Sequence, residues 1–292
     1  MQFLHIILRL FFLQKSETMS NFGKTIHNMR LAQKISQQEL AKDLFDRSEI
    51  SKIENAELST TYENEIKLIK RLGLTPNEFE YICNGYHIST KSQLLHRFLN
   101  LAGSIDKNKI NNLLNDCLLV KNDNDIKNIS IILRSLLMVD KPNGLNKARE
   151  LVQPIWFSSL RNVKVLTATD ITILNSILFA FDYQTAKEII SKIISDINQY
   201  YPFLRSLKAD TLINQAIMEI TKHKFKLAIT TLTSLKPLLK DLKQYDKLLV
   251  VNARLAICQN NRKEALDQIN LLHKIGADAL AKSLSREIKD SL

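Results

Sequence analysis

The chain has 292 residues, of which 45% are hydrophobic, and this is enough to bury one large core or two smaller ones. Its three cysteines and six histidines are scattered, without CxxC, HxxxH or HExxH spacing, so we expect no metal site and a reducing compartment, the cytoplasm. No GxxxxGK[ST], GxGxxG or GxSxG string occurs and no nucleophile–base or paired-carboxylate set can be placed, so we expect neither an enzyme nor a cofactor.

The net charge of +11 is unevenly distributed along the chain. Residues 1–90 carry 11 Lys/Arg and 11 Asp/Glu, whereas residues 91–292 carry 30 basic and 19 acidic side chains. Such an excess is compatible with nucleic-acid binding and equally with a solvated basic surface. Glycine and proline are rare, and apolar residues recur at helical spacing almost throughout, so the sequence predicts an all-α protein.

Residues 1–18 contain an apolar run interrupted by His5 and Arg9. The run is too short to span a membrane and has no small-residue cleavage site after it. We expect it to be an upstream extension, with translation starting at Met19, rather than a membrane-associating segment.

Five short amphipathic helices are predicted between residues 19 and 86. Ser36 and Glu39 form a capping box before the second helix, Ser48 is expected to cap the third, and Thr75 with Glu78 forms a capping box before the fifth. The predicted helices cover residues 22–34, 37–44, 49–55, 64–74 and 77–86. The side chains expected in their core are Ile26, Met29, Ala32, Leu40, Ala41, Leu44, Ile50, Ile53, Ile66, Ile69 and Leu72.

The string SQQELAKDL…RSEISKIEN resembles the helix-turn-helix domain of the phage-repressor and xenobiotic-response-element family. In that family the second helix of the pair enters the DNA major groove while the first crosses the backbone. The resemblance covers about residues 19–86 and implies double-stranded DNA as a partner. The residues that it places at the DNA are Gln37, Gln38, Arg47, Ser48, Glu49, Lys52 and Asn55.

These positions imply different kinds of contact. Gln37 would hold a phosphate, while Arg47, Ser48 and Lys52 would face base edges, where Arg and Lys can donate to guanine. Glu49 would either accept from a cytosine amine or cap the helix locally.

Two further features follow from the same resemblance. Arg30 and Glu54 match positions that pair inside the fold, so we expect a structural ion pair. The turn is one residue shorter than usual and has Phe45-Asp46-Arg47 without the common glycine, and ENA replaces the frequent ENG after the third helix.

Residues 87–292 contain a weak internal repeat in which a helix with a central Asn is followed by a second helix with an inward Ala. Arg134, Asn175, Asn214 and Asn252 are spaced by 41, 39 and 38 residues, which is typical of stacked helical hairpins. We therefore predict a right-handed superhelix of tetratricopeptide-like hairpins, closed by a terminal helix after Gly276. The inward alanines are Ala148, Ala186, Ala228 and Ala265.

The first helices of such hairpins line a concave face. An Asn on each of them would form a ladder of amides that both donate and accept, which suits an extended peptide backbone. Asn175, Asn214 and Asn252 are therefore candidate peptide-binding residues, and Arg134 would offer a charge to a carboxylate. The alternative is that these amides satisfy buried groups between hairpins.

A short-turn helix-turn-helix followed by about 200 residues of helical repeats resembles the Rgg/GadR/MutR regulators, which with PlcR-like proteins are cytosolic receptors of Gram-positive bacteria for signalling peptides. The resemblance implies a homodimer, a short hydrophobic peptide as ligand and a two-fold promoter site, without membrane association. Some members carry a redox cysteine after the third helix, where Tyr62 stands here.

Residues 19–86 are thus expected to bind DNA, and residues 87–292 to bind a peptide and to dimerise. One alternative is a repressor whose repeats serve only for dimerisation or for a non-peptide ligand. Another is a helical-repeat adaptor that sequesters a protein partner.

Overall fold

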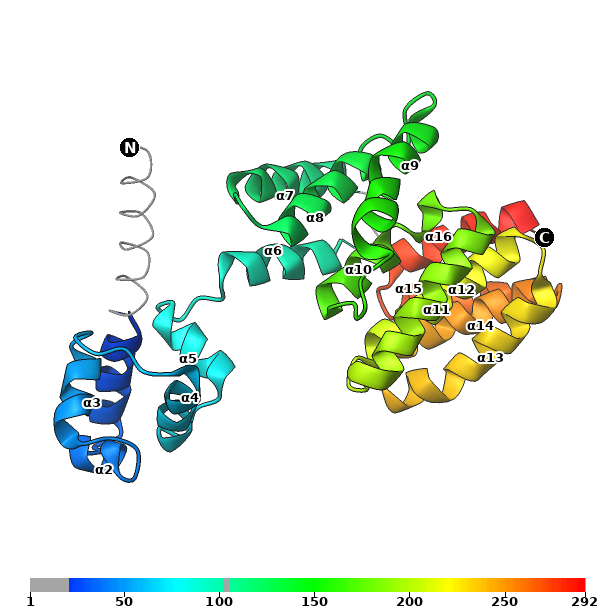
Figure 1. Ribbon diagram of the computed structural model, residues 1–292. Helices are drawn as coiled ribbons and strands as arrows, with labels where there is room; N and C mark the ends of the chain where they lie inside the picture. Colours follow the sequence, from blue (N-terminus) through cyan, green and yellow to red (C-terminus); the bar gives the residue numbers. More distant parts are fainter. Residues whose placement is uncertain (1–20, 102–105, 292) are drawn as a thin grey trace, which may run out of the picture. The chain divides into compact units, whose positions relative to one another are not determined.

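The computed structural model describes residues 21–101 and 106–291, and the chain divides into two compact units between Gln93 and Leu94 (Figure 1). Every regular element in these residues is helical, which confirms the all-α prediction. The expectation for residues 1–18 concerns a segment outside the described residues.

The first unit contains the predicted five helices. Residues 21–32 are helical and are followed by α2 (Gln37–Ala41), α3 (Arg47–Glu54), α4 (Tyr62–Arg71) and α5 (Pro76–Cys83). Their apolar faces meet in one core that includes Ile26, Leu40, Ile50, Ile53, Leu68, Ile69, Leu72 and Phe79. The prediction for Ala32 was wrong: it is exposed, because the first helix turns this face toward solvent near its end.

Gly23 is required by a close approach between two helices of this core. A Cβ at this position would lie 2.1 Å from the Ile53 carbonyl oxygen and 2.9 Å from that of Glu54. Any side chain would therefore push the first helix away from the end of α3.

The turn directly after α3 contains a residue with a left-handed backbone, Ala56. Ala56 has φ 60°, and its N–H donates to Ile53 O at 3.0 Å, while the Glu57 N–H donates to Lys52 O at 2.8 Å. Glycine is the usual residue at such a position, because it has no Cβ to clash. Ala56 is the alanine of the ENA string, at the place of the glycine in the frequent ENG. The backbone of Ala56 is therefore strained.

Ala56→Gly is expected to stabilise the first unit by about 0.5–1 kcal/mol, because relief of the left-handed strain exceeds the added flexibility of the unfolded chain. Ala32→Gly, in a right-handed helical residue, should instead destabilise it by about 1 kcal/mol. Hydrogen exchange of the buried amides of α3 measures both. Equal destabilisation by the two substitutions would contradict the account.

The second unit contains the rest of the helices. The division between the units falls within α6 (Thr90–Leu99). From there the first half of the second unit runs through α7 (Lys107–Leu119), α8 (Asn124–Leu136), α9 (Gly144–Pro154), the π-helical turn η1 (Ile155–Leu160), α10 (Ala168–Ser176) and the 3-10 turn η2 (Leu178–Ala180). Its second half runs through α11 (Tyr183–Tyr200), α12 (Arg205–Thr221), α13 (Phe225–Asp241), α14 (Tyr245–Cys258), α15 (Arg262–Lys274) and α16 (Asp278–Ser291).

The predicted hairpins are confirmed as α8 with α9, α10 with α11, α12 with α13, and α14 with α15, which follow one another through the second unit (Figure 1). The inward alanines Ala148, Ala186, Ala228 and Ala265 are fully buried. The first helices of successive hairpins are also bonded directly, since Lys247 of α14 pairs with Asp210 of α12. The stack therefore repeats its contacts at the spacing that the sequence indicates.

Four consecutive helices of the stack end in the same way. A left-handed residue closes α12, α13, α14 and α15, and the N–H of the next residue donates to a carbonyl five positions earlier. This Schellman-type closure satisfies the last carbonyls and reverses the chain within three residues. The left-handed residues are His223, Lys243, Asn260 and Gly276. Because only one of them is glycine, the repeats leave little glycine signal in the sequence.

The predicted terminal helix is α16, which packs against α14 and α15. Leu284 and Ile288 are buried on its inner side. Arg254 of α14, itself buried, donates to both carboxylate oxygens of Glu287, at 2.9 and 2.6 Å. This pair fixes the last helix onto the stack.

Candidate functional site

The first candidate site is the outward side of the α2–α3 pair. The helix α2 starts at the predicted capping box: the Ser36 hydroxyl accepts from Glu39 N at 3.1 Å, and the Glu39 carboxylate accepts from Ser36 N at 2.7 Å. Gln37 is therefore the first residue of α2, and its half-buried side chain points back toward the end of α3, as its bond to Glu54 shows.

The turn between the two helices differs from the prediction. The helix α2 ends at Ala41 rather than residue 44, because the backbone leaves the helical region at Lys42, with ψ 124°, and Asp43 follows in a left-handed conformation with φ 58°. Aspartate tolerates this conformation better than most residues, so the turn needs no glycine. The N-cap of α3 is Asp46 and not Ser48: the Asp46 N–H donates to the Glu49 carboxylate at 2.8 Å, which lets α3 begin at Arg47.

The side chains of Arg47, Ser48 and Lys52 are exposed on α3, while Ile50 and Ile53 are buried on the opposite side. Among the described residues, neither Arg47 nor Lys52 forms an ion pair. The structure thus brings these cations onto one free surface. The remaining residues expected at DNA are Gln38 and Asn55, which are exposed, and Glu49, which is half-buried and engaged in the cap.

A buried polar cluster joins the first helix, α2 and α3. The Glu54 carboxylate accepts from Arg30 Nε at 2.6 Å and from Arg30 Nη2 at 3.0 Å, which confirms the predicted ion pair. His27 Nδ1 lies 2.8 Å from Glu54 Oε2, and Gln37 Nε2 donates to the same oxygen at 3.0 Å. Arg30 also donates to Ile35 O at 3.0 Å. The cluster therefore ties three helices to one carboxylate.

The electrostatics of the cluster keep this carboxylate charged. Burial alone would raise the pKa of the Glu54 carboxyl, but the hydrogen bonds from Arg30, His27 and Gln37 outweigh burial and hold its pKa below the ordinary value. The same carboxylate raises the pKa of Arg30. An ionised Glu54 can only accept hydrogen bonds, so every group around it must present a donor.

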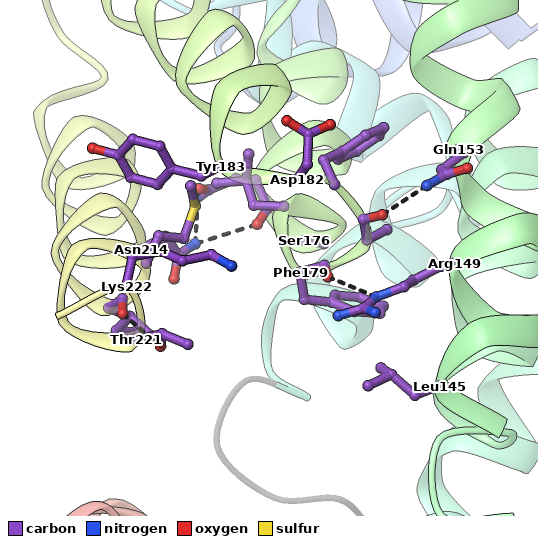
Figure 2. A pocket seen from close by; sticks show the side chains of 16 residues that line it. Leu145, Arg149, Gln153, Ser176, Phe179, Asp182, Tyr183, Asn214, Thr221 and Lys222 are labelled. Carbon is purple, nitrogen blue, oxygen red and sulfur yellow. Dashed lines mark hydrogen bonds between the residues drawn. The ribbon is translucent and has the colours of Figure 1, made fainter. Parts of the chain in front are cut away.

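The second candidate site is a pocket of about 780 Å³ in the second unit, which holds the hairpin repeats and is called the repeat unit below (Figure 2). One wall comes from α9, with Leu145, Arg149 and Gln153. The opposite wall comes from α10 and α12, and the turn through η2 forms the remainder. The residues lining these parts are Asn175, Ser176, Leu178, Phe179, Ala180, Phe181, Asp182, Tyr183, Asn214, Ile217, Met218, Thr221 and Lys222.

Two of the predicted amides meet in this pocket. Asn214 Nδ2 donates to the backbone oxygen of Asn175 at 3.2 Å and to its Oδ1 at 2.9 Å (Figure 2). Asn252 is not part of the lining; its Nδ2 lies 3.4 Å from Gln268 Oε1 in the second helix of its own hairpin. Arg134 is exposed on α8 and does not line the pocket either.

The pocket has a positive charge balance. Asp182 is the single carboxylate among the described residues that line it, and it caps α11: its Oδ1 accepts from the Gln184 and Thr185 backbone N–H groups, and its Oδ2 accepts from the Thr185 hydroxyl. Arg149 makes a long contact of 3.4 Å to Phe179 O, and within the described residues neither it nor Lys222 pairs with a carboxylate. An anionic group entering the pocket would meet two cations and an apolar wall.

The sequence did not indicate several of these lining residues, among them Arg149, Gln153, Phe179 and Met218. They lie on α9, on the η2 turn and on α12, and no spacing relates these segments. The prediction followed the first helix of each hairpin, whereas the pocket forms where α9 faces the next hairpin. The one available signal was the aromatic pair Phe179 and Phe181 in a turn otherwise expected to be polar.

Among the described residues, no group of three or more His, Cys, Asp or Glu side chains could hold a metal ion. None of the helices within residues 21–101 and 106–291 is both long and apolar enough to cross a membrane.

Comparison with known proteins bears on both units. Residues 26–79 match a family model described as helix-turn-helix. No curated protein matches the sequence. Among solved structures, a protein of Listeria monocytogenes EGD-e proposed to be a transcriptional regulator has a TM-score of 0.70 at 17% identity, with 94% of this chain and 98% of that one covered.

Two further structures have named functions. The SHP pheromone receptor Rgg2 of Streptococcus dysgalactiae has a TM-score of 0.66 at 20% identity, with 93% of this chain and all of that one (100%) covered. PlcR of Bacillus thuringiensis, in complex with the peptide PapR7 and DNA, has a TM-score of 0.67 at 12% identity, with 89% of this chain and 99% of that one covered. The chain has the Rgg and PlcR fold. The predicted resemblance to Rgg-type architecture is thereby confirmed, from the helix-turn-helix through the hairpin repeats.

Proposed function

We propose that the protein is a DNA-binding transcription regulator of the Rgg and PlcR type. The observation that carries this proposal is the α2–α3 pair, matched by the helix-turn-helix family, with Arg47, Ser48 and Lys52 exposed on the outer side of α3. In helix-turn-helix proteins this surface enters the major groove, where Arg and Lys read guanine. The solved structure of PlcR holds DNA, which supports the same use of the fold here.

We infer that the protein acts as a homodimer in the cytoplasm. Helix-turn-helix dimers bind two half-sites about one helical turn, roughly 34–36 Å, apart, so that a two-fold protein reads a two-fold DNA site. Analytical ultracentrifugation of the full chain with and without a short duplex tests this inference. A monomer that binds one half-site at full affinity would contradict it.

We further propose that the repeat unit binds a short hydrophobic signalling peptide in the pocket between α9 and α12. The apolar lining residues Leu145, Phe179 and Met218 suit aliphatic or aromatic side chains. Beyond their mutual bond, Asn175 keeps its Nδ2 donor and Asn214 its Oδ1 acceptor for a peptide backbone, and Arg149 can hold a carboxylate. Rgg2 is a pheromone receptor and PlcR is bound to PapR7, which supports a peptide ligand.

The test is calorimetric titration of the full chain with synthetic peptides encoded by short reading frames beside its gene. Asn175→Ala and Asn214→Ala are each expected to weaken binding by about 1 kcal/mol, because each removes one neutral hydrogen bond to the peptide backbone. The double variant should lose the transcriptional response while basal DNA binding persists. Asn198→Ala, an exposed amide on α11 outside the pocket, is the matched control.

A specific observation favours one alternative for these amides, namely the bond from Asn214 to Asn175, which links two hairpins. If the double variant keeps its peptide affinity but melts at lower temperature, the amides are inter-hairpin bonds. If no peptide binds wild-type protein at all, the repeats serve for dimerisation or for another ligand.

A further inference from the structure

Gln37 and Glu54 form a contact that the ion pair with Arg30 does not require. Glu54 Oε1 accepts from Arg30 Nε, while Oε2 accepts from Arg30 Nη2 and Gln37 Nε2 and lies within bonding distance of His27 Nδ1. The two oxygens are thus surrounded by donors from the first helix and α2. Gln37 is the only one of these donors that belongs to the helix expected to cross the DNA backbone.

The chemistry of the contact fixes the orientation of the Gln37 amide. A carboxylate that is charged can only accept, so the nitrogen end of the amide must face Glu54. That nitrogen carries two hydrogens, and the bond to Glu54 uses one of them. Gln37 is half-buried, so its side chain is not fully enclosed by the protein. The bond to Glu54 therefore fixes the direction of the second hydrogen relative to α2.

We propose that Glu54 is a positioning residue for DNA binding, which holds the Gln37 amide so that its second Nε2 hydrogen is presented to a DNA phosphate. This inference rests on the proposed function. The physical benefit is preorganisation: a free glutamine must lose rotamer freedom when it binds, whereas a glutamine already fixed by Glu54 has lost that freedom on folding. A buried side chain thereby contributes to DNA affinity without touching DNA.

The salt dependence of DNA affinity should distinguish the Gln37 contact from the contacts of Arg47 and Lys52. A neutral amide bonded to a phosphate displaces no condensed counterion, in contrast to a lysine or arginine. Loss of the Gln37 contact should therefore weaken binding equally on all DNA sequences, and the dependence of log affinity on log salt should keep its slope. Loss of Arg47 or Lys52 should lower that slope.

The experiment is a double-mutant cycle in the full chain, measured by fluorescence anisotropy with a mixed-sequence duplex of about 30 base pairs. Gln37→Ala is expected to weaken binding roughly ten-fold, as for a hydrogen bond to a charged acceptor. Glu54→Gln should weaken it by a similar factor in the wild-type background and by less than about two-fold in the Gln37→Ala background. Gln33→Ala removes an amide bond to Leu72 O in the same unit and should leave DNA affinity unchanged.

A second readout does not depend on DNA. In nuclear magnetic resonance spectra of the free protein, the Gln37 side-chain amide should be rigid in wild-type protein and mobile in Glu54→Gln. If Glu54→Gln fails to fold, Glu54→Asp takes its place in the cycle, because the shorter carboxylate still neutralises Arg30 but is withdrawn from Gln37.

The outcomes separate the inference from the function on which it rests. If the Gln37 and Glu54 changes add independently, or if Gln37→Ala is neutral while wild-type protein binds the duplex, Glu54 does not position Gln37 and the inference fails. If wild-type protein binds no duplex at all, the proposed function itself fails.

Discussion

Arg30→Ala is expected to lower the free energy of unfolding of the first unit by about 3–5 kcal/mol, because it leaves a buried carboxylate without its charged partner. The Arg30 and Glu54 side chains are 8% and 3% exposed, so water cannot replace the lost donor. His27 and Gln37 still donate to Glu54, which places the expected value near the lower end. Hydrogen exchange of the buried amides around Ile50 measures this loss within the intact chain.

The chain offers a matched control. Arg97 and Asp116 form an ion pair with the same N–O distance of 2.6 Å, but their side chains are 44% and 47% exposed. Arg97→Ala should cost less than about 1 kcal/mol, because solvent screens an exposed pair. A combined Arg30→Met and Glu54→Leu variant should regain much of the stability, since it removes both charges. Equal losses for Arg30→Ala and Arg97→Ala would contradict the buried-pair account.

Arg47→Ala with Lys52→Ala is expected to weaken binding to a selected DNA site by about 2–6 kcal/mol, because each side chain is a candidate base contact worth about 1–3 kcal/mol. The loss should be smaller on mixed-sequence DNA, and the preference for guanine at the contacted positions should disappear. Anisotropy titrations with a site selected from a random duplex library measure both quantities.

The control for this pair removes the same charge from the same unit. Lys67→Ala with Lys70→Ala changes two lysines of α4, a helix that the helix-turn-helix geometry does not place in the groove. This variant should keep both affinity and sequence preference. Unchanged sequence preference in the Arg47 and Lys52 variant would show that α3 is not the reading helix.

Local signals in the sequence account for much of the first unit. The capping boxes at Ser36 and Thr75 could be predicted because each depends on residues three positions apart. The start of α3 could not, since Asp46 and Ser48 are both good caps, and the choice depends on the left-handed backbone at Asp43. The Arg30–Glu54 pair was predicted through family resemblance rather than from spacing.

In the repeat unit, the sequence predicts the hairpins better than the pocket. The hairpins were predictable because the buried alanines recur at regular intervals, and each hairpin packs on its neighbours in the same way. The pocket was only partly predictable. Asn175 and Asn214 followed from the repeat, but Arg149 lies on α9, outside the series of Asn positions, and its approach to Phe179 depends on tertiary packing.

Sequencing the DNA that co-purifies with the full chain from its own cells tests the claim that this helix-turn-helix protein reads a promoter site. We expect fragments enriched around a two-fold site whose half-sites lie about one helical turn or a multiple of it apart. The enrichment should be absent for the Arg47→Ala and Lys52→Ala variant. Fragments distributed like the whole genome, or equally enriched with both cations removed, would contradict the claim.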